Sequence, residues 1–253
     1  MSLTTAMRER VSPNHEARQA ATPVDVLVLH YTGMQSAADA LDRLCDPVAR
    51  VSSHYLVEED GTVWRLVDEG RTAFHAGISC WRGQQALNAR SVGIEIVNPG
   101  HEWGYRAFPP EQMDAVEALC RAILRRHPIP ARNVIAHSDA APERKQDPGE
   151  LFPWAQLADQ GIGLWPFAVP DLGCAAPVID AESLRPVRAG LARLGYKVAG
   201  EGGQDEALVA VLRAFQRHWR PEAVTGLADR GTRARLAAVT WLACEAQSRS
   251  YRG

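Results

Sequence analysis

At 253 residues, with 46% apolar and 23% charged side chains, the chain has the composition of a globular protein and is long enough for two domains. The formal net charge of −2 argues against a nucleic-acid partner held by bulk electrostatics. No apolar run is as long as a membrane span, and the first ten residues lack the apolar centre of a signal peptide. We therefore expect a cytoplasmic protein, with the periplasm as the alternative if a native leader is missing from this sequence.

The five cysteines lie far apart in the sequence and form no C-x-x-C pair. An odd, scattered set is more typical of reduced core thiols than of a disulfide framework or a zinc cluster. Cys45 and Cys120 lie on the apolar faces of expected helices, which supports this interpretation. The cysteines therefore favour a reducing compartment.

The first 160 residues alternate expected strands and helices. Runs of β-branched and aliphatic residues predict the strands, Glu59-Asp-Gly61 predicts a hairpin turn, and Pro47 and Pro128 end the helices. The order of elements predicts an α/β fold with a mixed central β-sheet flanked by helices. In chain order we expect an extended arm (1–23), a buried strand (24–30), a helix capped by Ser36, a hairpin (53–57 and 62–67), a strand (91–97), a helix that begins at Pro110, and a short strand (133–136).

The character of the sequence changes after residue 160. Residues 161–178 are rich in Gly, Pro and aromatic residues without periodicity, which predicts a linker. Residues 179–247 carry three helical patterns, and the apolar stripe from Leu208 to Trp219 is the clearest of them. We therefore expect a catalytic domain at 24–160 and a small three-helix domain at 179–247.

Polar residues at the ends of two expected strands indicate a metal site. His30 closes the first buried strand, His137 closes the short strand that begins near Asn133, and Asp147 lies on the loop after it. Two imidazoles and one carboxylate suit a catalytic zinc ion, which keeps a fourth position for water. Each residue taken singly also fits a structural role. A lone His at a strand end is more often a hydrogen-bonded structural residue, and Asp before Pro is a common turn former. The complete set favours one Zn²⁺ per chain.

Glu95 and Lys145 are the candidate catalytic residues. A carboxylate in the middle of an apolar strand is costly to bury unless it is paired, and such a setting suits a general base. Strand alternation equally allows Glu95 to face solvent. Lys145 lies two residues before Asp147, close enough to stabilise an oxyanion, although its neighbour Arg144 also fits an exposed basic loop.

Several separated motifs carry a resemblance to a known family. They occur in this order: Leu29-His-Tyr-Thr32, Ser53-His-Tyr55, His75-Ala-Gly77, Leu87-Asn88, Ser91-Val-Gly-Ile-Glu-Ile96, His137-Ser-Asp139 and Arg144-Lys-Gln-Asp-Pro-Gly149. Together they resemble the zinc-dependent N-acetylmuramoyl-L-alanine amidases of type 2, which are related to peptidoglycan recognition proteins and T7-type lysozymes. The resemblance covers about residues 8–166.

The resemblance implies a role for each residue of the predicted site. His30, His137 and Asp147 would bind zinc. Glu95 would act as general base, and Lys145 would stabilise the intermediate. Candidate substrate-binding residues follow from the same stretch of chain: Tyr31, His75, Trp81, Asn88 and Arg144.

The C-terminal module resembles the three-helix peptidoglycan-binding domain through segments 191–196, 211–217 and 224–226. A plain helical packing domain is the alternative, because Phe215 and Trp219 also fit a core stripe. The two resemblances imply hydrolysis of the amide bond between N-acetylmuramic acid and L-alanine, in peptidoglycan or in (anhydro-)muropeptides, during bacterial cell-wall turnover or recycling. The alternative is a non-catalytic peptidoglycan recognition protein, which the complete ligand set disfavours.

Overall fold

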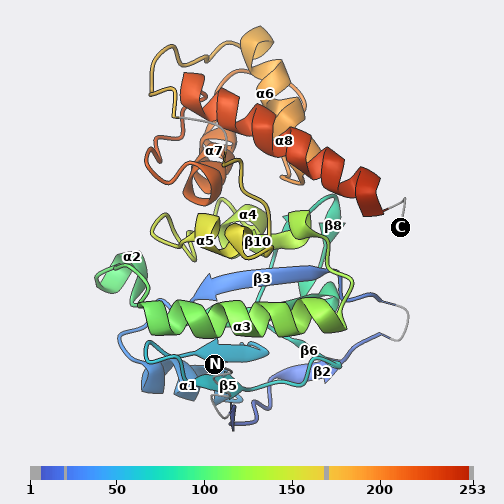
Figure 1. Ribbon diagram of the computed structural model, residues 1–253, viewed down its shortest axis with the longest axis vertical. Coiled ribbons are helices and arrows are strands. Elements are labelled where there is room, and N and C mark those ends of the chain that lie inside the picture. The colour runs from blue at the N-terminus through green and yellow to red at the C-terminus, as the bar shows by residue number, and fades with distance from the viewer. Residues whose placement is uncertain (1–6, 20–21, 168–170, 251–253) are drawn as a thin grey trace. The chain divides into compact units, whose positions relative to one another are not determined.

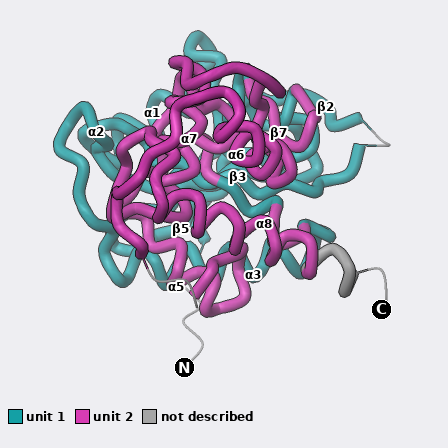
Figure 2. Tube along the Cα trace, turned by 90° about the horizontal axis from the view of Figure 1, so that it is seen from above, with its two compact units in different colours: residues 1–78, 86–129, 133–135 teal, residues 79–85, 130–132, 136–253 magenta. Residues whose placement is uncertain are grey.

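The computed structural model describes residues 7–19, 22–167 and 171–250. The Cα trace divides into two compact units, which Figure 2 colours separately. Unit 1 comprises residues 1–78, 86–129 and 133–135, and unit 2 comprises residues 79–85, 130–132 and 136–253.

Unit 1 contains the expected mixed β-sheet flanked by helices (Figure 1). The six strands lie in the order β1-β5-β4-β9-β3-β10, in which β4, β9 and β3 are parallel and β5 is antiparallel to β4. Strand β3, between β9 and β10, is buried along nearly its whole length, as its continuous apolar sequence predicts. The strands are β1 (Arg8–Glu9), β3 (Val26–Tyr31), β4 (Tyr55–Val57), β5 (Val63–Arg65), β9 (Ser91–Ile96) and β10 (Val134–Ala136).

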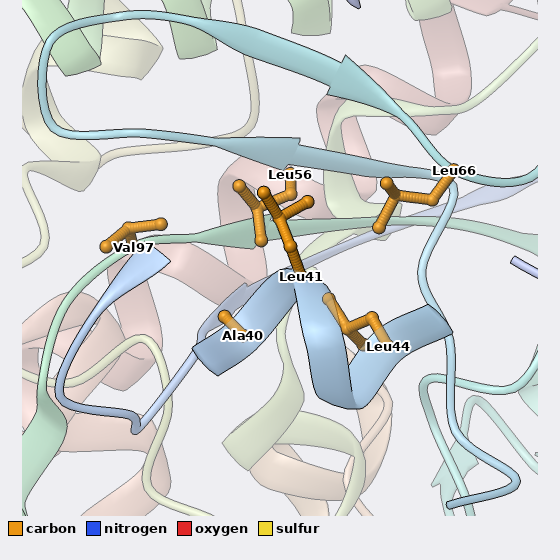
Figure 3. Packing of buried hydrophobic residues seen from close by; sticks show 6 residues of the cluster. All are labelled: Ala40, Leu41, Leu44, Leu56, Leu66 and Val97. Atoms are coloured by element: carbon orange, nitrogen blue, oxygen red, sulfur yellow. The ribbon is translucent and has the colours of Figure 1, made fainter. Parts of the chain in front are cut away.

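Helix α1 (Ala37–Cys45) packs on this sheet through its apolar face. The Ser36 hydroxyl caps it, as predicted, by accepting the Asp39 backbone N–H at 3.1 Å. Figure 3 shows Leu41 of α1 directed toward Leu56 of β4, within a buried cluster of Ala40, Leu41, Leu44, Leu56, Leu66 and Val97.

Helix α3 (Pro110–Arg126) begins and ends where the two prolines predicted. Its Gln112 is fully buried and donates from Nε2 to the carbonyls of Val57 and Val97, at 3.2 and 2.8 Å. These bonds satisfy carbonyls at the ends of two strands and fix the helix against the sheet. The remaining short elements are β2 (His15–Ala17), β6 (Arg71–Ala73), η1 (Leu87–Arg90), α2 (Gly100–Trp103) and η2 (Ala131–Asn133).

The described part of the expected N-terminal arm is extended and paired with the rest of unit 1. Strand β1 pairs with β5, and β2 pairs with β6. Just after β2, the Arg18 guanidinium donates to the carbonyls of Arg71, Ala89 and Ser91, at 2.8, 2.6 and 3.1 Å. One side chain thus ties the arm to segments that lie far from it in sequence.

Unit 2 is mainly helical, and its last three helices confirm the three predicted patterns. The apolar residues of the predicted stripe are all buried: Leu208, Val211, Leu212, Phe215 and Trp219. Gly195 ends the first of these helices with a φ of 143°, and Asp229 accepts the Thr232 N–H at 2.8 Å at the start of the last. The elements are β7 (Cys80–Trp81), β8 (Gln84–Gln85), α4 (His137–Ala140), α5 (Trp154–Asp159), α6 (Ala181–Leu194), α7 (Glu206–Trp219) and α8 (Arg230–Ser250).

One local prediction was wrong. We expected a strand that His137 closes, followed directly by a loop. Instead, β10 ends at Ala136 and His137 is the first residue of the short helix α4. The Asp139 carboxylate accepts the Ala136 N–H at 2.9 Å, which stabilises this helical turn where the apolar pattern alone indicated only a strand end.

The predicted linker is partly attached to the helices of unit 2. The Arg220 side chain is fully buried and donates to both carboxylate oxygens of Asp229 at 2.9 Å and to Asp171 at 3.0 Å. A buried guanidinium needs such partners, because an unpaired charge in the interior is strongly destabilising. The boundaries of the two domains stay a prediction.

The five cysteines are free thiols. The expectation that they lie in the core holds for Cys120, whereas Cys174 and Cys244 are exposed. Within the described residues, each helix is too short or too polar to cross a membrane.

His54 is buried beside Arg18. Its Nδ1 accepts the Gly93 N–H at 3.0 Å, so the neutral ring carries its proton on Nε2, which lies 3.2 Å from the Arg71 carbonyl oxygen. Burial, with a further contribution from the charge of Arg18, lowers the pKa of His54 to about 4, although the Arg71 carbonyl opposes the shift. The folded protein therefore binds this proton only under acidic conditions.

This shift predicts acid sensitivity between pH 6.5 and 4. In that window His54 is protonated in the unfolded chain but not in the folded protein. The free energy of unfolding should therefore decrease as the pH is lowered from 6.5 to 4, by about 3 kcal/mol in total. Urea titrations at several pH values measure this dependence. His54→Asn should flatten it, and the exposed-site control His101→Asn should leave it unchanged. An equally steep dependence in His54→Asn would contradict the assignment.

Candidate metal centre and active site

His30 and Glu95 lie opposite each other on two neighbouring parallel strands. The register pairs His30 of β3 with Glu95 of β9, and paired residues project from the same face of a sheet. Each is the penultimate residue of its strand, so both lie at the carboxyl edge, where α/β sheets commonly place catalytic groups. His30 is buried and Glu95 is half-buried. The register thus places the carboxylate beside the imidazole, which alternation within one strand left open.

Strand β10 lies next to β3 in the sheet, and His137 follows its last residue. The chain then loops back toward His137. The Ser138 N–H donates to the Asp147 carbonyl at 3.0 Å, and the Asp147 Oδ2 lies 3.0 Å from the His137 Nδ1. The Asp147–Pro148 peptide bond is cis. The loop therefore brings Asp147 onto its histidine partner, as the sequence predicted.

The three predicted ligands come together. One ligand atom from each of His30, His137 and Asp147 lies within 4.8 Å of the other two. The three residues are 1%, 3% and 5% exposed, which is unusual for such polar groups unless they are paired or bind a metal. Two imidazole nitrogens and one carboxylate oxygen suit a transition-metal ion that keeps a fourth position open. The donor set thus fits a catalytic metal ion.

His75 lies directly behind His30. The Ser91 hydroxyl donates to the Leu87 carbonyl at 2.7 Å, so its oxygen accepts the His75 Nε2–H at 2.9 Å. The His75 Nδ1 then accepts the His30 Nε2–H at 3.0 Å. This relay leaves the Nδ1 lone pair of His30 as its ligand atom. His75, which we expected to bind substrate, is thus placed to orient a ligand.

The close packing around His75 explains a glycine in the central strand. A Cβ at Gly93 would lie 2.5 Å from the His75 ring, which is closer than real Cβ contacts allow. Any larger residue at this position would displace the ring that orients His30.

Asn88 and Trp81 have structural partners. The Asn88 Oδ1 accepts the backbone N–H groups of His75 and Ala76, at 3.1 and 2.7 Å, and so holds the loop before the relay. Trp81 is 2% exposed and packs edge-on against Tyr196, with ring centroids 5.2 Å apart. These contacts favour a positioning role for Asn88 and a packing role for Trp81.

The other three predicted side chains are more accessible. The Tyr31 hydroxyl lies 3.0 Å from the His101 Nδ1. Arg144 is exposed and Lys145 is half-buried. The backbone N–H groups of both residues donate to the Ala141 carbonyl at 3.0 Å. Their place on the loop before Asp147 is compatible with contact to a substrate.

Sequence reasoning missed the partners of Asp139. This fully buried carboxylate accepts the Tyr196 hydroxyl at 2.5 Å and lies 2.6 Å from the His218 Nδ1. Burial, and then the charge and the hydrogen bond of Asp139, raise the pKa of Tyr196 well above its usual range, so this tyrosine remains a donor. The partners are 57 and 79 residues away in sequence, and no local pattern indicates such a contact.

Residues 20–150, more than half of the chain, match the family described as N-acetylmuramoyl-L-alanine amidase. The chain belongs to this family. It is thus an amidase that acts on the bond between N-acetylmuramic acid and L-alanine. Residues 180–236 match a peptidoglycan-binding domain, in agreement with the second resemblance.

Three relatives are especially similar to this amidase. The amidase AmiD of Escherichia coli is 43% identical over 234 residues, which cover 85% of this chain and 82% of AmiD. The structure of AmiD in complex with the substrate anhydro-N-acetylmuramic acid-L-Ala-D-γ-Glu-L-Lys has a TM-score of 0.75 at 39% identity, covering 88% of this chain and 91% of that chain.

The second relative is AmpDh3 of Pseudomonas aeruginosa, in complex with an anhydromuramic pentapeptide. It has a TM-score of 0.72 at 28% identity and covers 96% of this chain and 98% of its own. The third is the 1,6-anhydro-N-acetylmuramyl-L-alanine amidase AmpD of Citrobacter freundii, which is 36% identical over 108 residues, covering 43% of this chain and 56% of AmpD.

The relay predicts that His75 governs metal affinity in this amidase. His75→Phe should weaken divalent-metal binding by about 10–100-fold, because His30 loses the acceptor of its Nε2–H. Competition with a chromophoric chelator measures the affinity. His127→Phe, at a histidine bonded to Glu69 instead, is the control and should bind metal normally. Wild-type affinity in His75→Phe would show that the relay has no such role.

Proposed function

We propose that the chain is a zinc-dependent amidase in which His30, His137 and Asp147 hold one zinc ion. The observation that carries this proposal is the convergence of three buried donors at one point, with Glu95 facing His30 across the strand pair. A zinc ion bound by three protein ligands supplies a Lewis acid and lowers the pKa of a coordinated water. The family relationship supports zinc over other metals that imidazole binds.

Glu95 is the general base in this proposal. Its carboxylate takes a proton from the attacking water as the water oxygen adds to the lactyl carbonyl carbon of the muramic acid. It then returns that proton to the nitrogen of L-alanine as the C–N bond breaks. The products are the lactyl carboxylate and a peptide with a free amino group. The half-buried position of Glu95 beside His30 supports this role.

Lys145 stabilises the negative charge that develops on the carbonyl oxygen. Its place two residues before Asp147 brings an ammonium group to the loop that carries the ligand. The exposed Arg144 and the accessible Tyr31 are proposed to contact the substrate outside the reacting centre.

The proposed substrates are anhydro-muropeptides, with peptidoglycan as the polymeric alternative. Complexes of AmiD and AmpDh3 with anhydromuramic peptides support the first class. The match of residues 180–236 to a peptidoglycan-binding domain supports the second, since a binding module raises the effective concentration on a polymer. The two matches also support a catalytic domain at 24–160 and a binding module at 179–247, joined by a linker at 161–178.

The compartment follows from the substrate. Free thiols fit the cytoplasm, where anhydro-muropeptides are recycled, and we propose this location. Efficient cleavage of intact sacculi would instead place the enzyme in the periplasm.

Metal removal tests the proposed function. Dialysis against a chelator should abolish release of the peptide from an anhydro-muropeptide, and one equivalent of Zn²⁺ per chain should restore it, because the base alone does not polarise the carbonyl. Chromatography of the products, with anhydro-muropeptides and intact sacculi assayed side by side, measures both activity and preference. A metal-free protein that cleaves at the full rate would refute zinc dependence, and one that binds sacculi without cleaving would be a recognition protein.

The base is tested separately. Glu95→Gln should retain zinc but lower kcat by about 10²–10⁴-fold, because the amide cannot accept the water proton. Zinc content and kcat are measured on the same preparation. Glu111→Gln, an exposed site in the first turn of α3, is the matched control and should keep full activity. Parental kcat in Glu95→Gln would exclude Glu95 as the base.

A further inference from the structure

Helix α7 contacts both ends of the segment 137–150, which carries two of the three metal ligands. Near one end, the His218 Nδ1 lies 2.6 Å from the carboxylate of Asp139, which is two residues after His137. At the other, the Arg217 Nη2 donates to the Gln146 Oε1 at 2.9 Å, directly before Asp147. Two consecutive residues of the C-terminal module thus hold the two ends of one loop.

The Asp139 contact is built for rigidity. Its carboxylate is fully buried and receives the Tyr196 hydroxyl, the His218 ring and the Ala136 N–H, at 2.5, 2.6 and 2.9 Å. The Ala136 N–H belongs to the residue just before His137, so the carboxylate links the module to the backbone that carries the ligand. A buried carboxylate that lost these donors would have to move toward water or toward another partner.

Aromatic packing fixes the His218 ring. It lies between the rings of Trp154 and Trp219, each with a centroid 3.7 Å from its own and interplanar angles of 22° and 4°. His218 is 1% exposed, so its orientation toward Asp139 is restrained from both sides. Tyr196 also packs edge-on against Trp81 and Trp219. The two donors to Asp139 therefore have little freedom to leave it.

The second attachment is more open. Arg217 also approaches Glu150, with Nε 3.6 Å from a carboxylate oxygen, and its side chain is 13% exposed. Gln146 and Glu150 flank Asp147 on either side in sequence. A guanidinium that bridges them restricts the loop without occupying the ligand itself.

We propose that the C-terminal module is a structural part of the metal centre, in which Tyr196, Arg217 and His218 are positioning residues for His137 and Asp147. This inference rests on the proposed zinc site and adds a second role to a module whose family match indicates binding to peptidoglycan. It implies that substitutions in the module change the metal affinity of the site, although the ligands His137 and Asp147 lie outside the module.

Zinc affinity of the full-length chain tests the proposal. Tyr196→Phe deletes one oxygen, and His218→Phe keeps the aromatic stack but removes the donor. Each should weaken zinc binding at least about tenfold and shift the visible absorption bands of the Co²⁺-substituted protein, because the ligand geometry relaxes. His218→Asn, whose side-chain amide replaces the Nδ1 donor, should restore most of the affinity.

The matched control is Arg188→Met. Arg188 is 2% exposed and donates to the carbonyls of Ala199, Gly202 and Gly203, away from Asp139, so its loss destabilises the same module without touching the loop. It should keep wild-type zinc affinity and an unchanged cobalt spectrum even though it unfolds more easily. Loss of zinc affinity in this control would show that general stability of the module, not the Asp139 contact, sets the affinity.

Wild-type affinity and an unchanged cobalt spectrum in both Tyr196→Phe and His218→Phe would overturn the proposal. Should His218→Phe fail to fold, Tyr196→Phe decides the matter alone, and Arg217→Met, at the more exposed attachment, provides a second measurement with an expected loss of several-fold. A parent chain that binds no zinc would reject the proposed function itself, which separates the two failures.

Discussion

Burial of the three ligands constrains the rest of the active site. An imidazole or carboxylate that is withdrawn from water must find hydrogen-bond partners or a metal ion, or it destabilises the fold. His30, His137 and Asp147 are each at most 5% exposed, and each is held by a polar neighbour. The orientation of every ligand is therefore set by a second group, which must itself be satisfied. The buried polar network extends outward from the ligands until it reaches backbone carbonyls, as at Leu87 behind the Ser91 hydroxyl.

The parallel pairing of β3 with β9 places the candidate base, Glu95, beside the buried ligand His30. A shift of one residue in the register would turn Glu95 to the opposite face from His30. Both strands are buried along nearly their whole length, so the packing of the sheet and the placement of the base are coupled. Gly93 belongs to the same arrangement, since the space it leaves is filled by the His75 ring. Core packing and ligand orientation cannot be changed independently here.

The sequence predicted the parts of this arrangement that are encoded locally. Continuous apolar runs predicted β3 and β9, the prolines predicted the ends of α1 and α3, and the stripe from Leu208 to Trp219 predicted α7. Within the site, residue types at strand ends predicted a metal-binding group, and the motifs implied which residues form it. The predictions of the helices and strands succeeded because the alternation or periodicity of a short segment is sufficient to decide them.

Features that depend on pairing between distant segments were not predictable in this way. Alternation could not decide the face of Glu95, because the answer lies in the register with another strand. The His75 ring bonds to a residue 45 positions away, and no local pattern indicates that bond. The helix that begins at His137 was missed because the Asp139 carboxylate stabilises it. The partners of that carboxylate are Tyr196, just after α6, and His218 of α7. In each case the deciding interaction is a tertiary hydrogen bond with no local signature.

The buried Asp139 also bears on how a binding module becomes part of an enzyme. A flexible tether would raise the local concentration of substrate while leaving the catalytic domain unaltered. Here the tyrosine and histidine donors are buried with the carboxylate, so separating them would expose or orphan three polar groups at once. Loss of the module would remove two of the three hydrogen-bond donors of Asp139, two residues after the ligand His137.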